Sequence, residues 1–200
     1  MQGLVIQRGF SKALSRQVAA IYDGAFSEKA GLAIPDAQRR LEIIEKGFNP
    51  EFSFLALDDG KPAGVASFKT REGSLTSGIT ANSLLRELGF FGGLRAIFVF
   101  SIFDRSFAER QLLLDAIAVD ASMRSKGVGK ALIEALKDFA IEQGYTSIRL
   151  DVVDTNPRAQ QLYERIGFQV EKVESMGMLS DFLGFNAVTS MVLPLKQDAL

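Results

Sequence analysis

With 47% hydrophobic and 24% charged residues, this chain of 200 residues has the composition of a folded protein with a sizeable core. Its formal net charge of −1 gives no field that would attract nucleic acid, so no nucleic-acid partner is expected. The absence of cysteine and histidine excludes disulfides, a cysteine nucleophile and a Ser-His-Asp triad, and no metal site is expected. The first ten residues lack the basic and then apolar layout of a secretory signal, so a cytoplasmic location is expected.

The first half of the chain predicts a strand followed by two helices. A short strand is expected at residues 4–6, and an amphipathic helix at 11–26, where apolar residues recur every three or four positions. Gly31 is expected to end this unit. Pro35 and Asp36 then predict the start of a second helix, which stops near residues 47–50.

An antiparallel hairpin is expected next. Residues 52–57 and 63–70 are two strand-like runs separated by the segment DDGKP at 58–62. An Asp-Gly step between apolar runs is a strong hairpin signal.

Residues 71–110 interrupt this order of elements and are interpreted as an insertion. Within it, residues 84–103 (LLRELGFFGGLRAIFVFSIF) are rich in Phe and Leu, but Arg86, Glu87 and Arg95 argue against a membrane span. Two interpretations stay open: a buried or dimer-facing helical insertion, which we favour, and a lid over an apolar acceptor pocket. An aromatic cluster of this density should not lie exposed in a monomer, so we expect something to cover it, for instance the partner in a homodimer.

The second half of the chain predicts a strand–helix–strand unit. Residues 112–119 have the apolar density of a central strand, with Asp115 as the only interior charge. A helix follows from Val128 to about Gly144, and residues 147–153 form another strand. Short connections of this kind indicate a parallel pair with a right-handed crossover.

The turn before that helix has the spacing Arg124-x-x-Gly127-x-Gly129. The first turn of a helix has unpaired N–H donors and a partial positive charge, and glycine lets a ligand approach the backbone closely. Arg124, Lys126 and Lys130 place three cations around the helix start. The set suits a pyrophosphate, although it differs from the Walker and dinucleotide-binding spacings. A loop that only needs flexible glycines is the structural alternative.

A short helix is expected after the second strand of the unit. Asn156 and Pro157 predict its start, and Gly167 predicts its end. Tyr163 lies about two turns after Asn156, so both side chains are expected on roughly the same side. Each has a structural alternative: Asn156 as a helix cap only, and Tyr163 as a packing aromatic.

Together these two motifs resemble the GNAT superfamily of acyl-CoA-dependent N-acyltransferases. The resemblance covers roughly residues 112–170 and rests on the stretch from Val119 to Gly129 and on the later pattern Asn156-x-x-Ala159-x-x-Leu162-Tyr163-x-x-x-Gly167-Phe168. It implies an α/β (α+β) fold with a mixed, mostly antiparallel sheet of about seven strands, four flanking helices and one splayed parallel pair. The chain is then one domain, 1–200, with an apolar insertion at about 71–110.

The resemblance also implies site residues, with acetyl-CoA as the acyl-donor substrate. The strand ending at Ile117, Ala118 and Val119 is expected to run beside the pantetheine arm, where an N–H near Ile117 or Ala118 polarises the thioester carbonyl. Asn156 resembles the residue that contacts the cofactor arm, and Tyr163 resembles the general acid that protonates the departing thiolate. Backbone N–H groups of the turn are expected to take the pyrophosphate, and the turn consists of Arg124, Ser125, Lys126, Gly127, Val128, Gly129 and Lys130.

The general base is a separate question, because an amine must lose a proton before it attacks. Asp115 is the first candidate: it lies two residues before Ile117 and is therefore expected on the same face of the strand. Glu109 is the second candidate. That Asp115 pairs with an arginine or marks a bulge is an equally weighted alternative.

A closing hairpin completes the chain, with strands at 169–174 and 187–195 and a loop at 175–186. Four apolar residues of the loop are interpreted either as lining for an acceptor pocket or as core: Met176, Met178, Phe182 and Phe185.

The expected function is transfer of an acyl group, most often acetyl, from acyl-CoA to a primary amine of a small molecule or a peptide. Because the chain has no cysteine or histidine for a covalent relay, direct attack in a ternary complex is favoured. Two alternatives belong to other classes: a non-catalytic acyl-CoA-binding sensor or regulatory module, and a self-associating interaction protein that uses residues 84–103. The apolar insertion favours a small hydrophobic acceptor or a peptide terminus.

Overall fold

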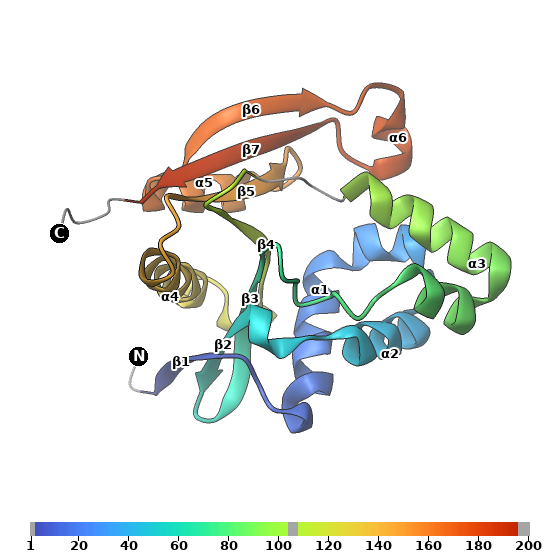
Figure 1. Cartoon of the computed structure of the whole chain (residues 1–200), viewed down its shortest axis with the longest axis horizontal. Coiled ribbons are helices and arrows are strands. Elements are labelled where there is room, and N and C mark those ends of the chain that lie inside the picture. Colours follow the sequence, from blue (N-terminus) through green and yellow to red (C-terminus); the bar gives the residue numbers. More distant parts are fainter. Residues whose placement is uncertain (1–2, 104–107, 196–200) are drawn as a thin grey trace.

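The structure is a computed structural model that describes residues 3–103 and 108–195. Among these residues, one mixed sheet has the strand order β1-β2-β3-β4-β5-β7-β6 (Figure 1). Neighbouring strands are antiparallel except β4 and β5, which are parallel, so the predicted mixed sheet with one parallel pair is confirmed. The strands are β1 (Leu4–Arg8), β2 (Ser53–Asp58), β3 (Lys61–Lys69), β4 (Gln111–Val119), β5 (Ser147–Val153), β6 (Gln169–Ser175) and β7 (Ala187–Pro194).

Helices cover both faces of the sheet. Helix α4 packs on one face and α1 and α2 lie on the other, as Figure 1 shows. Side chains alternate between the two cores: on β2, Phe54 and Ala56 join the α4 cluster, whereas Leu55 packs with Val18 of α1. The helices are α1 (Ser15–Ala33), α2 (Ala37–Gly47), α3 (Ala81–Phe103), α4 (Val128–Glu142), α5 (Pro157–Ile166) and the short α6 (Ser180–Leu183), with 3₁₀ turns at Lys12–Leu14, Pro50–Phe52, Ala121–Met123 and Gly177–Leu179.

The first helix is longer than the sequence predicts. Helix α1 passes through Gly31 and ends at Ala33, so the prediction that Gly31 stops it is wrong. The stop comes from Pro35, which disfavours helical backbone at the residue before it; Ile34 is accordingly extended (φ −133°, ψ 92°). The predicted start of α2 is confirmed, because the Asp36 carboxylate accepts a hydrogen bond from the Arg39 backbone N–H at 2.7 Å.

The predicted hairpin between β2 and β3 is also confirmed. Asp59 (φ 48°) and Gly60 (φ 76°) both have left-handed backbone, as a two-residue hairpin turn of the mirror-image type requires.

The insertion forms helix α3, which is divided at Gly89 (φ 70°, ψ 176°). One side of α3 is buried: Leu84, Ala96 and Val99 pack against Ile34 and Ile43 beside α1 and α2. The C-terminal part of the helix reaches the α6 region, which agrees with their positions in Figure 1. The helix predicted in this segment is therefore confirmed, whereas its being an insertion stays a prediction; residues 104–107 lie outside the described part of the chain.

The other side of α3 is exposed within this single chain, and its predicted cover, such as the partner in a homodimer, stays a prediction. Four large apolar side chains lie there with exposed fractions between 46% and 85%: Phe90, Phe91, Leu94 and Phe98. In the described residues, no helix has the length and hydropathy needed to cross a bilayer.

Candidate active site

The parallel strands β4 and β5 pair only where they begin. Residues 111–113 pair with 147–149, and beyond this point β4 continues along β3 while β5 continues along β7. Within the described ranges, no strand pairs with residues 116–119 on the side of β5. We call these backbone groups of Ala116 to Val119 the open edge of β4. They include all three residues predicted to run beside a cofactor arm.

A bulge in β4 places Asp115 at the point where the strands separate. Opposite β3, Ser67 is in register with Ala116 but Phe68 is in register with Leu114, so Asp115 is an extra residue in this strand. Such an extra residue shifts by one position the alternation of side chains between the two faces of the sheet. The bulge interpretation of Asp115 is therefore confirmed.

The same bulge separates Asp115 from Ile117. Leu114 and Ile117 both pack in the cluster that includes α4, whereas Asp115 lines a cavity on the α1 side, together with Tyr22. The prediction that Asp115 and Ile117 share a face is wrong, because simple alternation takes no account of the extra residue.

The turn after β4 is shaped by its own hydrogen bonds. The Asp120 carboxylate accepts from the hydroxyl and the backbone N–H of Ser122 at 2.5 and 2.9 Å, and these bonds hold the pKa of Asp120 below its ordinary value. The Asp120 N–H donates to the Ala63 carbonyl at 3.0 Å, which ties the turn to β3. Ser125 (φ 62°) and Gly127 (φ 79°) are both left-handed, so the chain winds tightly before α4 begins.

The N-terminus of α4 is an uncapped helix start surrounded by cations. Gly127 is its N-cap, and among the described residues no side chain accepts a hydrogen bond from the first turn. The N–H groups of residues 128–130 are thus available together with the positive end of the helix dipole. Arg124, Lys126 and Lys130 are exposed around this position. The structure brings together the turn residues that the sequence assigned to a pyrophosphate.

Helix α4, helix α5 and the open edge of β4 converge at Gly129. A methyl group at Gly129 would lie 3.6 Å from the Leu162 side chain of α5 and 3.8 Å from those of Ile117 and Val119. These are ordinary contacts, so protein packing does not require glycine here. That Gly129 leaves room for a ligand stays a prediction.

Asn156 acts as the cap of α5. Its side-chain oxygen accepts from the Ala159 N–H at 3.2 Å, and the side chain is exposed. The interpretation of Asn156 as a helix cap is therefore confirmed, and its contact with the cofactor arm stays a prediction.

Tyr163 of α5 is buried in the core. Only 6% of the residue is exposed, and its ring centroid lies 5.8 Å from that of Phe168. Burial raises the pKa of the Tyr163 phenol to about 12. The phenol therefore stays protonated at neutral pH, which is the form that a hydrogen-bond donor needs.

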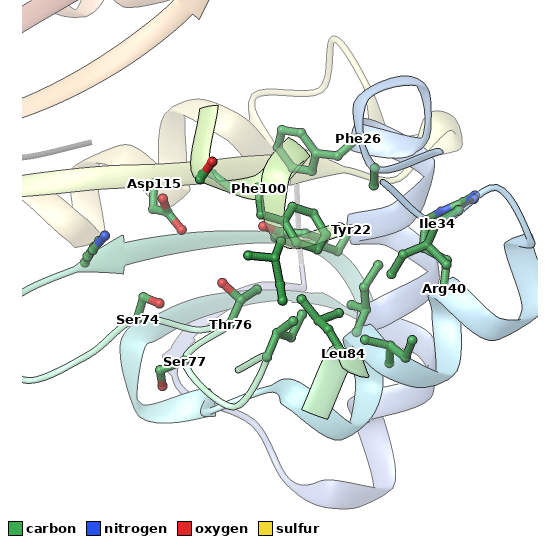
Figure 2. A pocket seen from close by; sticks show the side chains of 18 of the residues that line it. Tyr22, Phe26, Ile34, Arg40, Ser74, Thr76, Ser77, Leu84, Phe100 and Asp115 are labelled. Carbon is green, nitrogen blue, oxygen red and sulfur yellow. Dashed lines mark hydrogen bonds between the residues drawn. The ribbon is translucent and has the colours of Figure 1, made fainter. Parts of the chain in front are cut away.

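A cavity of about 570 Å³ lies on the other face of β4 from α4 (Figure 2). Its strand end includes Asp115 and Asp151, and Ser74 and Thr76 of the loop after β3 also line it. Most of the remaining lining is apolar and comes from α1, α2 and α3 and from the residue after α1, among them Phe26, Ile34, Ile43, Leu84, Ile97 and Phe100. Helix α3 thus supplies part of the cavity wall. This position agrees with the interpretation of the segment as a lid over an apolar pocket.

Tyr22 lines this cavity and was not recognised as a site residue from the sequence. Its ring packs 4.9 Å from Phe26 and 5.8 Å from Phe48, and burial, followed by the charge of Asp115, raises its pKa. Its hydroxyl is therefore a neutral hydrogen-bonding group close to Asp115. The only signal in the sequence was a tyrosine on an otherwise apolar helix face.

The charged groups at the helical end of the cavity are engaged with each other. Arg40 donates to the Asp23 carboxylate at 2.6 and 3.0 Å and to the Ile34 carbonyl at 2.8 Å. This hydrogen bonding to Asp23 raises the pKa of Arg40 above its ordinary value. The pair leaves the apolar end of the cavity close to neutral.

Other acidic candidates are less well placed than Asp115. Asp151 forms an ion pair with Arg149 at 3.3 Å. Glu109, the second predicted base, lies 3.3 Å from Arg71 on the surface and borders a different, smaller cavity.

The loop between β6 and β7 does not line the cavity. Phe185 is buried with Leu183 and Val188, whereas Met178 is fully exposed and Phe182 is 46% exposed. The core interpretation is confirmed for Phe185, and Met176 packs against the same cluster. None of the four residues lines the cavity beside Asp115, so the pocket interpretation stays a prediction for Met178 and Phe182.

The parallel pair β4 and β5 thus separates beside the uncapped start of α4, as the resemblance to acyltransferases implies, and a cavity lies on the opposite face. The model of the acetyltransferase (GNAT) family matches residues 17–168, and the chain belongs to this family.

Regions of known N-acetyltransferases resemble this chain in sequence. A probable N-acetyltransferase camello from Xenopus tropicalis is 33% identical over 72 residues, which are 36% of this chain and 33% of that protein. Thialysine N-epsilon-acetyltransferase from Bos taurus is 35% identical over 60 residues, which are 30% of this chain and 35% of that protein. The matched regions therefore span about a third of the length of these relatives.

Solved structures share the fold at low sequence identity. The crystal structure of an acetyltransferase has a TM-score of 0.64 and 16% identity, covering 96% of this chain and 100% of that one. A putative acetyltransferase from Salmonella typhimurium, solved with its cofactor acetyl-CoA, has a TM-score of 0.60 and 19% identity, covering 100% of this chain and 98% of that one.

Proposed function

We propose that this protein transfers an acetyl group from acetyl-CoA to a primary amine by direct attack in a ternary complex. One observation carries the proposal: within residues 115–119, β4 presents a carboxylate to a cavity on one face and an open backbone edge beside α4. Donor and acceptor can therefore meet at one point of one strand.

The residues present fit the donor. The N–H groups of residues 128–130, with Arg124, Lys126 and Lys130 around them, suit the pyrophosphate of coenzyme A. The open edge of β4 suits the amide groups of its pantetheine arm, because an extended arm can hydrogen-bond to it as a strand would. When bound, acetyl-CoA supplies the activated acetyl thioester.

The acceptor side uses the carboxylate at the bulge. Asp115 binds the ammonium form of the amine and accepts its proton, so that a neutral amine faces the thioester carbonyl. A backbone N–H of Ile117 or Ala118 donates to the carbonyl oxygen as negative charge develops there. The nitrogen–carbon bond forms as the carbon–sulfur bond breaks, and the second proton of the attacking nitrogen ends on the departing sulfur, which leaves as the free thiol of coenzyme A.

Tyr163 acts on the leaving group mainly as a hydrogen-bond donor. Its phenol pKa of about 12 lies well above that of an ordinary thiol, about 8.5. Donation to the developing thiolate is the role that suits a buried phenol.

The test combines binding with turnover. Isothermal titration should show binding of acetyl-CoA, and a panel of primary amines should release free thiol together with an equal amount of N-acetylated amine. Acetyl-CoA binding without turnover of any amine would favour the alternative of a non-catalytic sensor. Absence of acetyl-CoA binding would contradict the proposal.

A further inference from the structure

We propose that the acceptor is a small primary amine with a single positive charge and a bulky aromatic or branched apolar group, and that helix α3 selects it. This inference rests on the proposed function and adds the class of acceptor.

The cavity has a polar end and an apolar end. Figure 2 shows Asp115, Ser74 and Thr76 toward one side, and Ile34 and Leu84 toward the other. An amine at Asp115 therefore directs its substituent between the helices, where aromatic and branched aliphatic side chains surround it.

The size of the cavity suits a ring rather than a short alkyl group. A dry cavity of about 150 Å³ accommodates benzene. The volume of about 570 Å³ therefore has room for an aromatic ring and the arm that bears its amine.

The charges argue against acceptors that carry a second charge. At the helical end, the guanidinium of Arg40 is already neutralised by Asp23 at 2.6 Å. A second ammonium group would face this pair and the apolar side chains of α2 and α3. The other charged residues that line the cavity, Lys69 and Asp151, belong to the strands β3 and β5. Burial of a charge without a partner is unfavourable, so an acceptor that places a second ammonium group at the helical end is disfavoured.

Helix α3 supplies the selecting wall. Ile97 and Phe100 lie one turn apart and both line the cavity, whereas Phe98, between them, is 57% exposed and lies outside the lining. Neither Ile97 nor Phe100 is fully buried, so a truncation there changes the cavity without emptying the core. Phe98 offers a matched control on the same helix.

The experiment compares 2-phenylethylamine, propylamine and 1,4-diaminobutane as acceptors in the wild type. We expect the highest kcat/KM for 2-phenylethylamine, with 1,4-diaminobutane at least about tenfold lower. Phe100→Ala should lower kcat/KM for 2-phenylethylamine about tenfold or more and leave propylamine nearly unchanged. Phe98→Ala should match the wild type with all three amines.

Acetyl-CoA binding, measured by titration in every variant, separates this inference from the proposed function. If acetyl-CoA binds and 1,4-diaminobutane or a peptide N-terminus is preferred over 2-phenylethylamine, the inference is wrong although the acetyltransferase proposal stands. Equal losses for 2-phenylethylamine and propylamine in Phe100→Ala would also overturn it. Ile97→Ala provides the same comparison should Phe100→Ala fail to fold.

Discussion

Replacement of Gly127 by aspartate and by asparagine tests the pyrophosphate site with two side chains of nearly equal shape. Gly127 has left-handed backbone (φ 79°), which asparagine and aspartate tolerate better than other side chains. Strain is therefore shared by the two variants. They differ in one negative charge at the start of α4.

The charge should act in opposite directions on stability and on binding. A carboxylate at a helix N-terminus stabilises the helix by about 0.3–1 kcal/mol, so Gly127→Asp should unfold no more easily than Gly127→Asn. Gly127 is exposed, so a dielectric close to that of water applies. Two phosphate charges at ~4 Å then repel the carboxylate by about 2 kcal/mol, which corresponds to roughly 30-fold weaker binding.

Isothermal titration of acetyl-CoA, with urea unfolding of the same samples, measures both effects. The difference in Kd between the variants should shrink at high salt, because salt screens exposed charges. Equal affinities of Gly127→Asp and Gly127→Asn for acetyl-CoA at low salt would refute the pyrophosphate site at the start of α4.

Three further predictions concern the leaving group, the turn and the packing of α4. Tyr163→Phe should lower kcat about 10²-fold or more, measured as thiol release, and leave the Kd for acetyl-CoA unchanged. An unchanged kcat would show that Tyr163 takes no part in the reaction. The folded-state pKa of Asp120 is lowered, so its stabilising effect is present above its unfolded pKa of about 3.9 and is lost as pH falls through the folded value. The difference in the free energy of unfolding between wild type and Asp120→Ala should therefore vanish in acid. A difference that persists there would contradict a stabilising role of the ionised Asp120 carboxylate. Gly64→Ala places a methyl group 2.9 Å from the Ala118 carbonyl oxygen and should lower the free energy of unfolding by about 1–3 kcal/mol, whereas Gly129→Ala, with its nearest contact at 3.6 Å, should unfold no more easily than the wild type.

The features that the sequence predicted well depend on local chemistry. Asn156 caps α5 and Gly167 ends it with left-handed backbone (φ 110°), because each acts within a few residues of its own position. The same holds for the turn at Asp59 and Gly60. The start of α4 after Gly127 follows from the same kind of signal.

The features that it missed depend on contacts between distant segments. The bulge at Asp115 exists only in the register between β3 and β4, and it turns the carboxylate toward α1. Tyr22 becomes a site residue only because α1 packs over that position. The neutral Arg40–Asp23 pair joins two helices across 17 residues, so no local pattern announces it.

The most direct test of the account is the rate of acetyl-CoA turnover with 2-phenylethylamine in the wild type and in Asp115→Asn. Asparagine keeps the shape of the side chain but cannot take the proton of an amine. We predict that thiol release depends on the amine, and that Asp115→Asn lowers kcat/KM by about 10²–10⁴-fold while the Kd for acetyl-CoA is unchanged. Thiol release that is independent of the amine, or an Asp115→Asn variant as active as the wild type, would contradict a transfer centred on the bulge of β4.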